Sequence, residues 1–300
     1  MRYFTYFLKT LFYNVYILIL NALYYFRFYY KVKIGYFNSD FSNTQIKEDW
    51  ELTFIDEFEG DTVDFKTKWN PYFSNGDAVS NPAETPSLSS LDCINIIDNK
   101  VHLTIKKNEG FPENSEFPLV RGNLSTKPSY KLGGKNYFSQ QFGYFETSCK
   151  VPKNGMLFWP AFWLYGENWP PEIDIFEFMD SDDIGTEHTK SISMTTHWGP
   201  DGKRLMKNKQ QSQLGRNLKK LFRISLNFDE HFHVYGCRWE WDYIEWYIDN
   251  IPVFRTTYNI PDCRMHIIIG NAGWMKQLPT EEQMNDSLII DYIRAYKRIK

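Results

Sequence analysis

The stretch PEIDIFEF carries three carboxylates, Glu172, Asp174 and Glu177, among isoleucine and phenylalanine residues. Side chains alternate between the two faces of a strand, so Glu172 and Asp174 share a face and Glu177 should point the other way. One extra residue in the strand, a β-bulge, would reset the alternation and return Glu177 to the face of the other two acids. We therefore predict a bulged strand with all three acids on one surface and Ile173 and Ile175 toward the core.

Two glutamates placed in this way suit glycoside hydrolysis. Glu172 and Glu177 would stand about 13 Å apart along the backbone at about 3.3 Å per step. Their side chains can lean together to the ~5–5.5 Å of retaining glycosidases, in which one carboxylate is nucleophile and the other acid/base. Crowding with Asp174 favours keeping one acid protonated, and we expect Glu177 to hold that proton. Surface charges or calcium ligands are the alternatives, but repeated acids in an apolar strand are costly without a function.

Aromatic residues and one histidine surround this strand in the sequence. Trp159, Trp163 and Trp169 precede it, and rings beside paired carboxylates suit sugar recognition, although two of the three could equally be core residues. His197, in TTHWG, lies on the next expected strand. It could hydrogen-bond a carboxylate or a substrate hydroxyl, or be an ordinary structural histidine. We select Trp159, Trp169 and His197 as candidate substrate-binding residues.

The chain after Trp50 has the pattern of an all-β domain. KVHLTIKK places Val101, Leu103 and Ile105 on one face, and YIEWYID is followed by a hairpin turn at Asp249 and Asn250. Many such strands separated by turn signals predict a sandwich of two antiparallel sheets. Longer polar stretches, which we expect to form the walls of a binding cleft, lie at about 76–90, 108–130, 180–190 and 200–220.

The amino-terminal segment differs from the rest. Residues 11–26 carry no charge, and residues 1–33 hold five of the 34 Lys and Arg and none of the 37 Asp and Glu. We expect a hydrophobic helix over 1–33 that is an uncleaved membrane anchor, with a cleaved signal and secretion as the alternative. Residues 34–48 would form a linker, and residues 49–300 a catalytic domain outside the cytoplasm.

Composition also excludes some functions. The body beyond residue 33 has an excess of acid, which argues against nucleic-acid binding. The four cysteines are widely spaced without a C-x-x-C pair, which fits neither a zinc site nor a dense disulfide framework. We expect a monomer that needs no cofactor.

From about Trp50 to Lys300 the chain resembles glycoside hydrolase family 16, which includes laminarinases, lichenases, agarases and carrageenases. The resemblance rests on ordered motifs: WELTFIDEFEGDTVD, FGYFETSCKVPKNGMLFWPAFWL, the acidic strand, FHVYGCRWEWDYIEWYIDNIPVFR and LIIDYIRAYK. It implies a concanavalin-like β-jelly roll and retaining endo-hydrolysis of a β-linked polysaccharide. By motif position it implies that Glu172 is the nucleophile, Asp174 the supporting acid and Glu177 the acid/base. The extra residue before Glu177 resembles the bulged, laminarinase- and agarase-like branch.

Some residues limit the choice of substrate. Lys135 follows Gly134 where relatives often have Arg, and Lys lacks the bidentate fork of Arg. Trp274, in NAGW, matches a region near the cleft of the family and is a candidate stacking ring. Some relatives bind a structural calcium near both ends of the domain, and Glu57 and Asp291 lie in similar regions of this chain.

We expect an endo-glycosidase for a β-1,3-type glucan. The alternatives are a transglycosylase, a hydrolase of a galactan or an anionic polysaccharide, and a lectin-like sandwich that binds sugar without cutting it.

Overall fold

The computed structural model describes most of the chain. The described residues are 2–34, 49–73, 84–109, 116–129, 133–153, 158–178, 192–197, 210–213, 228–258, 260–274, 278 and 280–299. For residues 2–10, 84–85, 210–213 and 274 it describes the backbone alone. Most of the expected polar stretches 180–190 and 200–220 lies outside these ranges.

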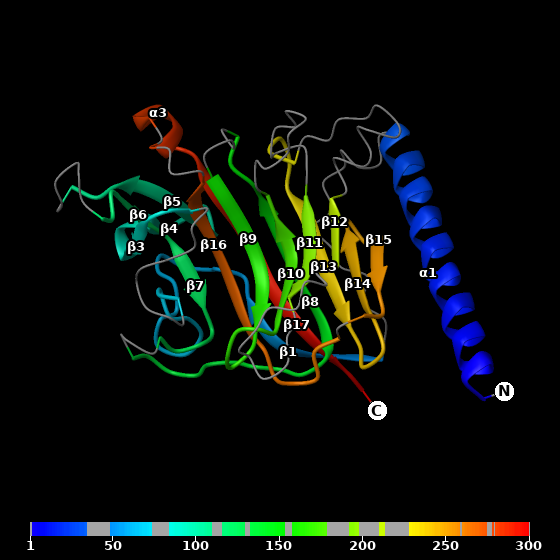
Figure 1. Ribbon diagram of the computed structural model, residues 1–300. Coiled ribbons are helices and arrows are strands. Elements are labelled where there is room, and N and C mark those ends of the chain that lie inside the picture. Colours follow the sequence, from blue (N-terminus) through cyan, green and yellow to red (C-terminus); the bar gives the residue numbers. More distant parts are fainter. Residues whose placement is uncertain are drawn as a thin grey trace.

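The chain begins with one long helix and continues as a two-layer β domain (Figure 1). Helix α1 (Arg2–Lys33) contains neither proline nor glycine, so nothing in it interrupts the backbone ladder. The expected amino-terminal helix is therefore confirmed. Two short helical turns, η2 (Leu91–Cys93) and α3 (Glu281–Met284), lie between strands.

Ten of the described strands form the larger sheet. Its order is β15 (Ile251–Thr256), β14 (Ile244–Ile248), β13 (His233–Trp239), β8 (Gly143–Lys150), β17 (Ser287–Arg298), β5 (Lys100–Lys107), β6 (Leu119–Arg121) and β3 (Ser87–Ser89), with β1 (Trp50–Asp56) paired to β17 and β4 (Ile94–Ile97) to β5. Neighbouring strands are antiparallel except for the short β3 and β6, which run parallel at one end.

Seven described strands form the second sheet, which faces the viewer in Figure 1. Its order is β12 (Gln210–Gln213), β11 (Ser193–His197), β10 (Glu172–Glu177), β9 (Phe158–Tyr165), β16 (His266–Trp274) and β2 (Glu84–Thr85), with β7 (Asn123–Ser125) also paired to β16. The expected jelly-roll-like sandwich of two sheets is confirmed.

The core lies between the two sheets and explains the sequence periodicity. Strand β5 buries Val101, Leu103 and Ile105 completely, as its alternation predicts. Strand β9 alternates buried and half-buried residues along its whole length, so one face packs on the core and the other faces outward. The predicted β14–β15 hairpin is present, and Asp249 and Asn250 both have the positive φ that a tight hairpin turn requires.

Candidate active site

Strand β10 contains the predicted bulge. Against β9, Asp174 pairs with Trp163 and Phe176 with Phe162, so Ile175 is the extra residue. The register with β11 shifts over the same interval. Ile175 and Phe176 both join the core, and the alternation restarts at Glu177. The irregularity predicted from the sequence is therefore real.

Pairing across the sheet shows which way the acids point. Residues directly opposite each other in antiparallel strands share a face. On β9, Glu172 faces Tyr165, Asp174 faces Trp163 and Glu177 faces Ala161. These three partners belong to the half-buried, outward set of β9. The outward surface that carries the three carboxylates is called the acidic face below.

Small residues flank Glu177 on the acidic face. Its partner on β9 is Ala161, which in turn pairs with Gly270 on β16. A side chain on Gly270 would approach the Asn123 amide, since an added Cβ would lie 2.7 Å from Asn123 Oδ1. The residues paired across the sheet beside Glu177, the proposed proton donor, are therefore small.

Each glutamate accepts a hydrogen bond from a tryptophan indole. Trp169 Nε1 donates to Glu172 Oε2 at 2.5 Å, and Trp159 Nε1 donates to Glu177 Oε1 at 3.1 Å. On the sequence alone, both rings are candidate sugar-binding residues. In the structure their polar edges orient the two carboxylates, a contact that sequence spacing does not reveal.

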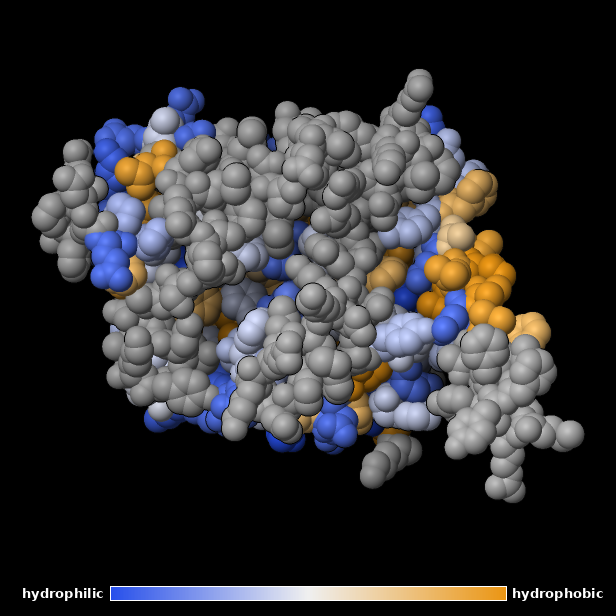
Figure 2. All heavy atoms as spheres, viewed as in Figure 1, coloured by the Kyte–Doolittle hydropathy of each residue, from blue (hydrophilic) through white to orange (hydrophobic). Residues whose placement is uncertain are grey.

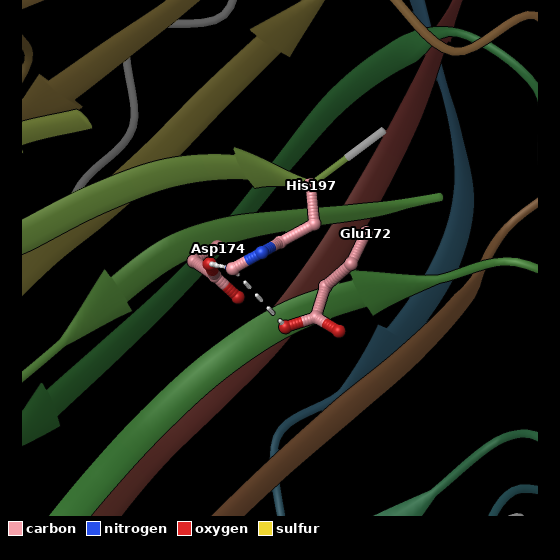
Figure 3. Close-up of side chains that lie close together, drawn as sticks. All are labelled: Glu172, Asp174 and His197. Carbon is pink, nitrogen blue, oxygen red and sulfur yellow. Dashed lines mark hydrogen bonds and ion pairs between the residues drawn. The ribbon is translucent and has the colours of Figure 1, made fainter. Parts of the chain in front are cut away.

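His197 joins the two neighbouring acids (Figure 3). Its Nε2 lies 3.1 Å from Asp174 Oδ2 and 3.9 Å from Glu172 Oε1. The imidazole also lies beside the Trp169 ring, with centroids 6.0 Å apart. Of the three interpretations offered by the sequence, the structure shows the bond to a carboxylate.

Burial changes the acidity of this pair. Burial raises the pKa of Glu172 well above its ordinary value, the neighbouring Asp174 raises it further, and His197 and the Trp169 indole oppose the rise. Burial is also the largest cause of the raised pKa of Asp174. The charge of Glu177 raises this pKa further, whereas His197 lowers it. The Glu172–Asp174 pair therefore retains a proton to higher pH than an exposed carboxyl would. That Glu177 holds a proton stays a prediction.

A tryptophan from the opposite sheet holds the bulge. Trp246 on β14 is fully buried, and its Nε1 donates to the backbone oxygen of Asp174 at 2.8 Å. A bulge disrupts the ladder and leaves backbone groups to be satisfied elsewhere. Trp246 supplies that partner from the larger sheet. Sequence reasoning missed it, because YIEWYID gave only a strand pattern.

The loop that carries Trp169 is anchored by a buried lysine. Lys127 is fully buried, its Nζ donates to the Gly166 oxygen at 2.9 Å, and it also bonds the Glu167 carbonyl. His266 lies 3.5 Å from the Glu167 carboxylate. These contacts fix the segment between β9 and β10, and so help to place the Trp169 indole over Glu172. No sequence signal singled out Lys127.

Three of the acidic-face residues could hold a metal ion by geometry. Donor atoms of Glu172, Asp174 and His197 lie within 4.8 Å of one another. The same three groups already bond one another and Trp169, which fits a proton-sharing cluster equally well. Glu57 and Asp291, the suggested calcium residues, pair with Arg294 and Lys100 respectively. Within the described ranges neither belongs to a group of three metal-ligating side chains.

Comparison with known families agrees with this geometry. The model of glycosyl hydrolases family 16 matches residues 92–294, about two thirds of the chain. The chain belongs to glycosyl hydrolases family 16. The acidic strand, the bulge and both tryptophan donors lie inside the matched segment.

Individual relatives of this family are distant. Endo-1,3-1,4-beta-glycanase EglC of Rhizobium meliloti (strain 1021) is 28% identical over 224 residues, which are 72% of this chain and 42% of EglC. A beta-1,3-glucan-binding protein of Penaeus monodon is 31% identical over 130 residues, 41% of this chain and 33% of that protein. The chain thus spans less than half the length of these relatives.

The fold similarity covers more of the chain. The laminarinase catalytic domain of Thermotoga maritima MSB8 superposes with a TM-score of 0.63 at 23% identity, over 84% of this chain and 100% of that domain. At this identity the match establishes the fold of the family 16 domain alone.

The remaining candidates lie apart from these contacts. The backbone of Lys135 is bonded to the Asn70 side chain, and its own side chain is exposed. The backbone of Trp274 ends β16, but its side chain lies outside the described residues. A further aromatic cluster was not selected: Arg121 lies 4.4 Å from the centroid of Phe73, whose ring is 5.7 Å from Trp163 opposite Asp174.

Proposed function

We propose that this protein is a retaining endo-glycosidase that cuts a β-linked polysaccharide. The observation that carries the proposal is the bulge at Ile175, which returns Glu177 to the face of Glu172. The indole bonds from Trp159 and Trp169 support the assignment, because they orient one carboxylate each. Family 16 membership supports glycoside hydrolysis as the reaction.

The two glutamates divide the chemistry. Glu172, ionised, attacks the anomeric carbon while Glu177 donates its proton to the glycosidic oxygen, and the leaving sugar departs. The result is a glycosyl ester on Glu172. Glu177, now a carboxylate, takes a proton from water, which attacks the same carbon and frees Glu172. Two displacements at one carbon retain its configuration.

Asp174 and His197 act on the ionisation of the nucleophile, Glu172, and not on the protonation of the leaving group. Because Glu172 and Asp174 share a raised affinity for a proton, Asp174 can carry that proton when Glu172 attacks. His197 bonds Asp174 and lies near Glu172, so its positive form would favour ionisation of both.

We propose a β-1,3-type glucan as the substrate. The name of EglC, an endo-1,3-1,4-beta-glycanase, supports a β-glucan. Lys135 and the locally basic stretch 200–220 keep a galactan or an anionic polysaccharide as alternatives. Reducing-sugar release from laminarin, mixed-linkage glucan, agarose, carrageenan and a uronic-acid polymer tests the choice. Products longer than the substrate would indicate transglycosylation instead.

Azide rescue tests the two roles separately. With an activated aryl β-glycoside, Glu172→Gly plus azide should give the α-glycosyl azide, because azide enters the space left by the nucleophile. Glu177→Gly plus azide should give the β-glycosyl azide, because the glycosyl ester still forms. Wild-type release of reducing sugar from a polysaccharide by either variant without azide, or the reverse stereochemistry with azide, would reject the assignment.

A binding-only protein is the second candidate, favoured by the similarity to the beta-1,3-glucan-binding protein. It would bind laminarin saturably and release no reducing ends at any pH. Retention of binding in Glu172→Gln together with lost hydrolysis would instead support the enzyme.

We further propose that α1 attaches the catalytic domain to a membrane on its extracytoplasmic side. The stretch Leu11–Lys33 is long and apolar enough to cross one. A cleaved segment followed by secretion is the alternative, and the amino-terminal sequence of the mature protein distinguishes the two.

A further inference from the structure

Helix α1 packs along the free edge of the larger sheet. It lies beside β15, the terminal strand, and runs in the opposite direction to it (Figure 1). Asn21 bonds both backbone groups of Arg255: the Arg255 N–H donates to Asn21 Oδ1 at 2.8 Å, and Asn21 Nδ2 donates to the Arg255 oxygen at 3.0 Å. One side chain thus does what a neighbouring strand would do for that edge.

Other contacts follow on the same helix face. The Tyr24 hydroxyl donates to Glu245 Oε2 at 2.5 Å, and the Tyr258 hydroxyl bonds the Asn14 side chain. Phe28 is fully buried in the domain core. The contacting positions 14, 21, 24 and 28 are separated by about two turns and then by one turn each, as one face of a helix requires.

The opposite face of α1 is apolar and exposed. Phe12 is 71% exposed, Leu18 69% and Phe26 62%, and further large apolar side chains lie between them. Figure 2 shows hydrophobic residues gathered at the right-hand edge of the molecule, where Figure 1 places α1. Asn14, Asn21 and Tyr24 thus bond the domain beside the buried Phe28, and the most exposed apolar side chains of α1 point away from it.

This arrangement is incompatible with a helix that spans a bilayer while docked. Asn21 and Tyr24 lie near the middle of Leu11–Lys33. A docked, spanning helix would bring the Arg255–Glu245 ion pair to the depth of the hydrocarbon core. Spanning would therefore require α1 to leave β15 and to expose Asn14 and Asn21 to lipid.

We propose that α1 lies in the plane of the membrane, docked on β15, with its apolar face buried at the bilayer surface. This inference rests on the proposed membrane attachment and not on the proposed catalysis. The charge of residues 1–33, five basic and no acidic, fits an anionic lipid surface and opposes pairing with the same helix of a second copy.

Two exposed aromatic residues lie at the end of the larger sheet where β15 ends. Tyr258, bonded to Asn14, is 42% exposed, and Trp241 is 76% exposed. Trp241 lies in the β13–β14 turn, at the sheet end where Ile244 pairs with Thr256. Tryptophan and tyrosine favour the membrane–water interface. The acidic face looks toward the viewer of Figure 1 and α1 lies at the edge, so this attachment leaves the acidic face uncovered.

Depth measurements on the full chain test the proposal. Phe12, Ile19 and Phe26 are exposed and spaced by one heptad, so all three share the outer face. Each is replaced by cysteine in a Cys263→Ser background, because Cys263 is the one partly exposed cysteine of the four. A nitroxide label then reports depth in vesicles of equal phosphatidylglycerol and phosphatidylcholine.

An in-plane helix predicts one shallow depth at all three positions. A spanning helix would place position 19 deepest, with the other two about 10 Å nearer to opposite surfaces. That gradient would overturn the in-plane proposal and leave membrane attachment standing. Failure of the protein to bind the vesicles would overturn both, as would a dimer in lipid-free solution that buries the three labels.

A docking variant supplies the control. Asn21→Leu with Tyr24→Phe removes the bonds to Arg255 on β15 and to Glu245 on β14, and should make the three label depths unequal. Tyr16→Phe changes an exposed tyrosine on α1 and should leave the depths equal. Equal depths in the docking variant would overturn the role of β15. Hydrolysis of a soluble substrate, measured on every variant, keeps this result separate from the catalytic proposal.

Discussion

Strands β10 and β14 both carry buried acids but surround them differently. On β14, Glu245 is 3% exposed and forms an ion pair with Arg255 at 2.6 Å, with hydrogen bonds from Tyr24 and Tyr247. On β10, Glu172 and Asp174 contact His197 and the Trp169 indole, and their pKa values are raised. A permanent cation makes Glu245 part of the structure. Titratable and neutral partners leave the β10 acids able to exchange protons, as catalysis requires.

Replacing Glu172 should give the largest effect. Glu172→Gln removes the nucleophile while the neutral amide keeps the shape of the protonated acid. We expect turnover to fall at least about 10³-fold, because no other described acid takes the same place opposite Tyr165. Initial rates on the best polysaccharide of the panel measure it. Turnover within tenfold of wild type would remove Glu172 from the mechanism.

The same variant should not lose stability. Burial raises the folded-state pKa of Glu172 above its ordinary 4.5, so the wild type is most stable with this acid protonated. Its stability should fall as pH rises from about that ordinary value through the folded pKa. Glu172→Gln has no carboxyl to ionise at this position, so its stability should not fall in this way. Denaturant titrations at high pH should therefore give it a free energy of unfolding at least as large as that of the wild type.

Glu245→Gln should show the opposite behaviour. Breaking its ion pair with Arg255 should lower the free energy of unfolding by about 2–3 kcal/mol. Turnover of the folded protein should stay near wild type, since Glu245 lies in the other sheet. Exposed Glu51→Gln is the matched control and should change stability by less than about 0.5 kcal/mol. Lost turnover in folded Glu245→Gln would contradict the comparison.

The bulge bond should have a smaller, selective effect. Trp246→Phe leaves the Asp174 carbonyl without its indole donor, so the acids should be less well placed and kcat should fall about tenfold. Trp239→Phe is a close control, because Trp239 is also fully buried and donates to a backbone oxygen, that of Pro261. Both variants should lose about 1–2 kcal/mol of stability. Equal kcat values would show that the bulge needs no such support.

The smallest expected effects are shifts of the pH profile of activity, and these shifts should have opposite directions in variants of Asp174 and of His197. Activity should rise with pH as Glu172 becomes ionised, and Asp174 raises its pKa whereas His197 lowers it. Asp174→Asn should therefore move the acidic limb of kcat/KM to lower pH, and His197→Asn should move it to higher pH. Shifts in the same direction would show that the two residues do not tune Glu172 as described.

Local pattern was enough to predict much of the fold and of the acidic strand. The alternation of KVHLTIKK, the turn at Asp249 and Asn250, and the misplaced Glu177 are properties of neighbours in sequence. They depend on the two-residue period of a strand, which holds wherever one face is buried. The apolar helix was predictable for the same reason.

The partners of these residues come from far along the chain, and only the tertiary structure decided them. Trp246 reaches the bulge across the core from 72 residues away, and Asn21 meets Arg255 across 234. The place of Trp159 and Trp169 beside the acidic strand in the sequence predicts sugar binding, but which atom each indole bonds depends on how β9, β10 and their loop pack. The sequence determined which residues share a face. Packing of the two sheets and of α1 decided what that face touches, because contacts between distant segments leave no local period to read.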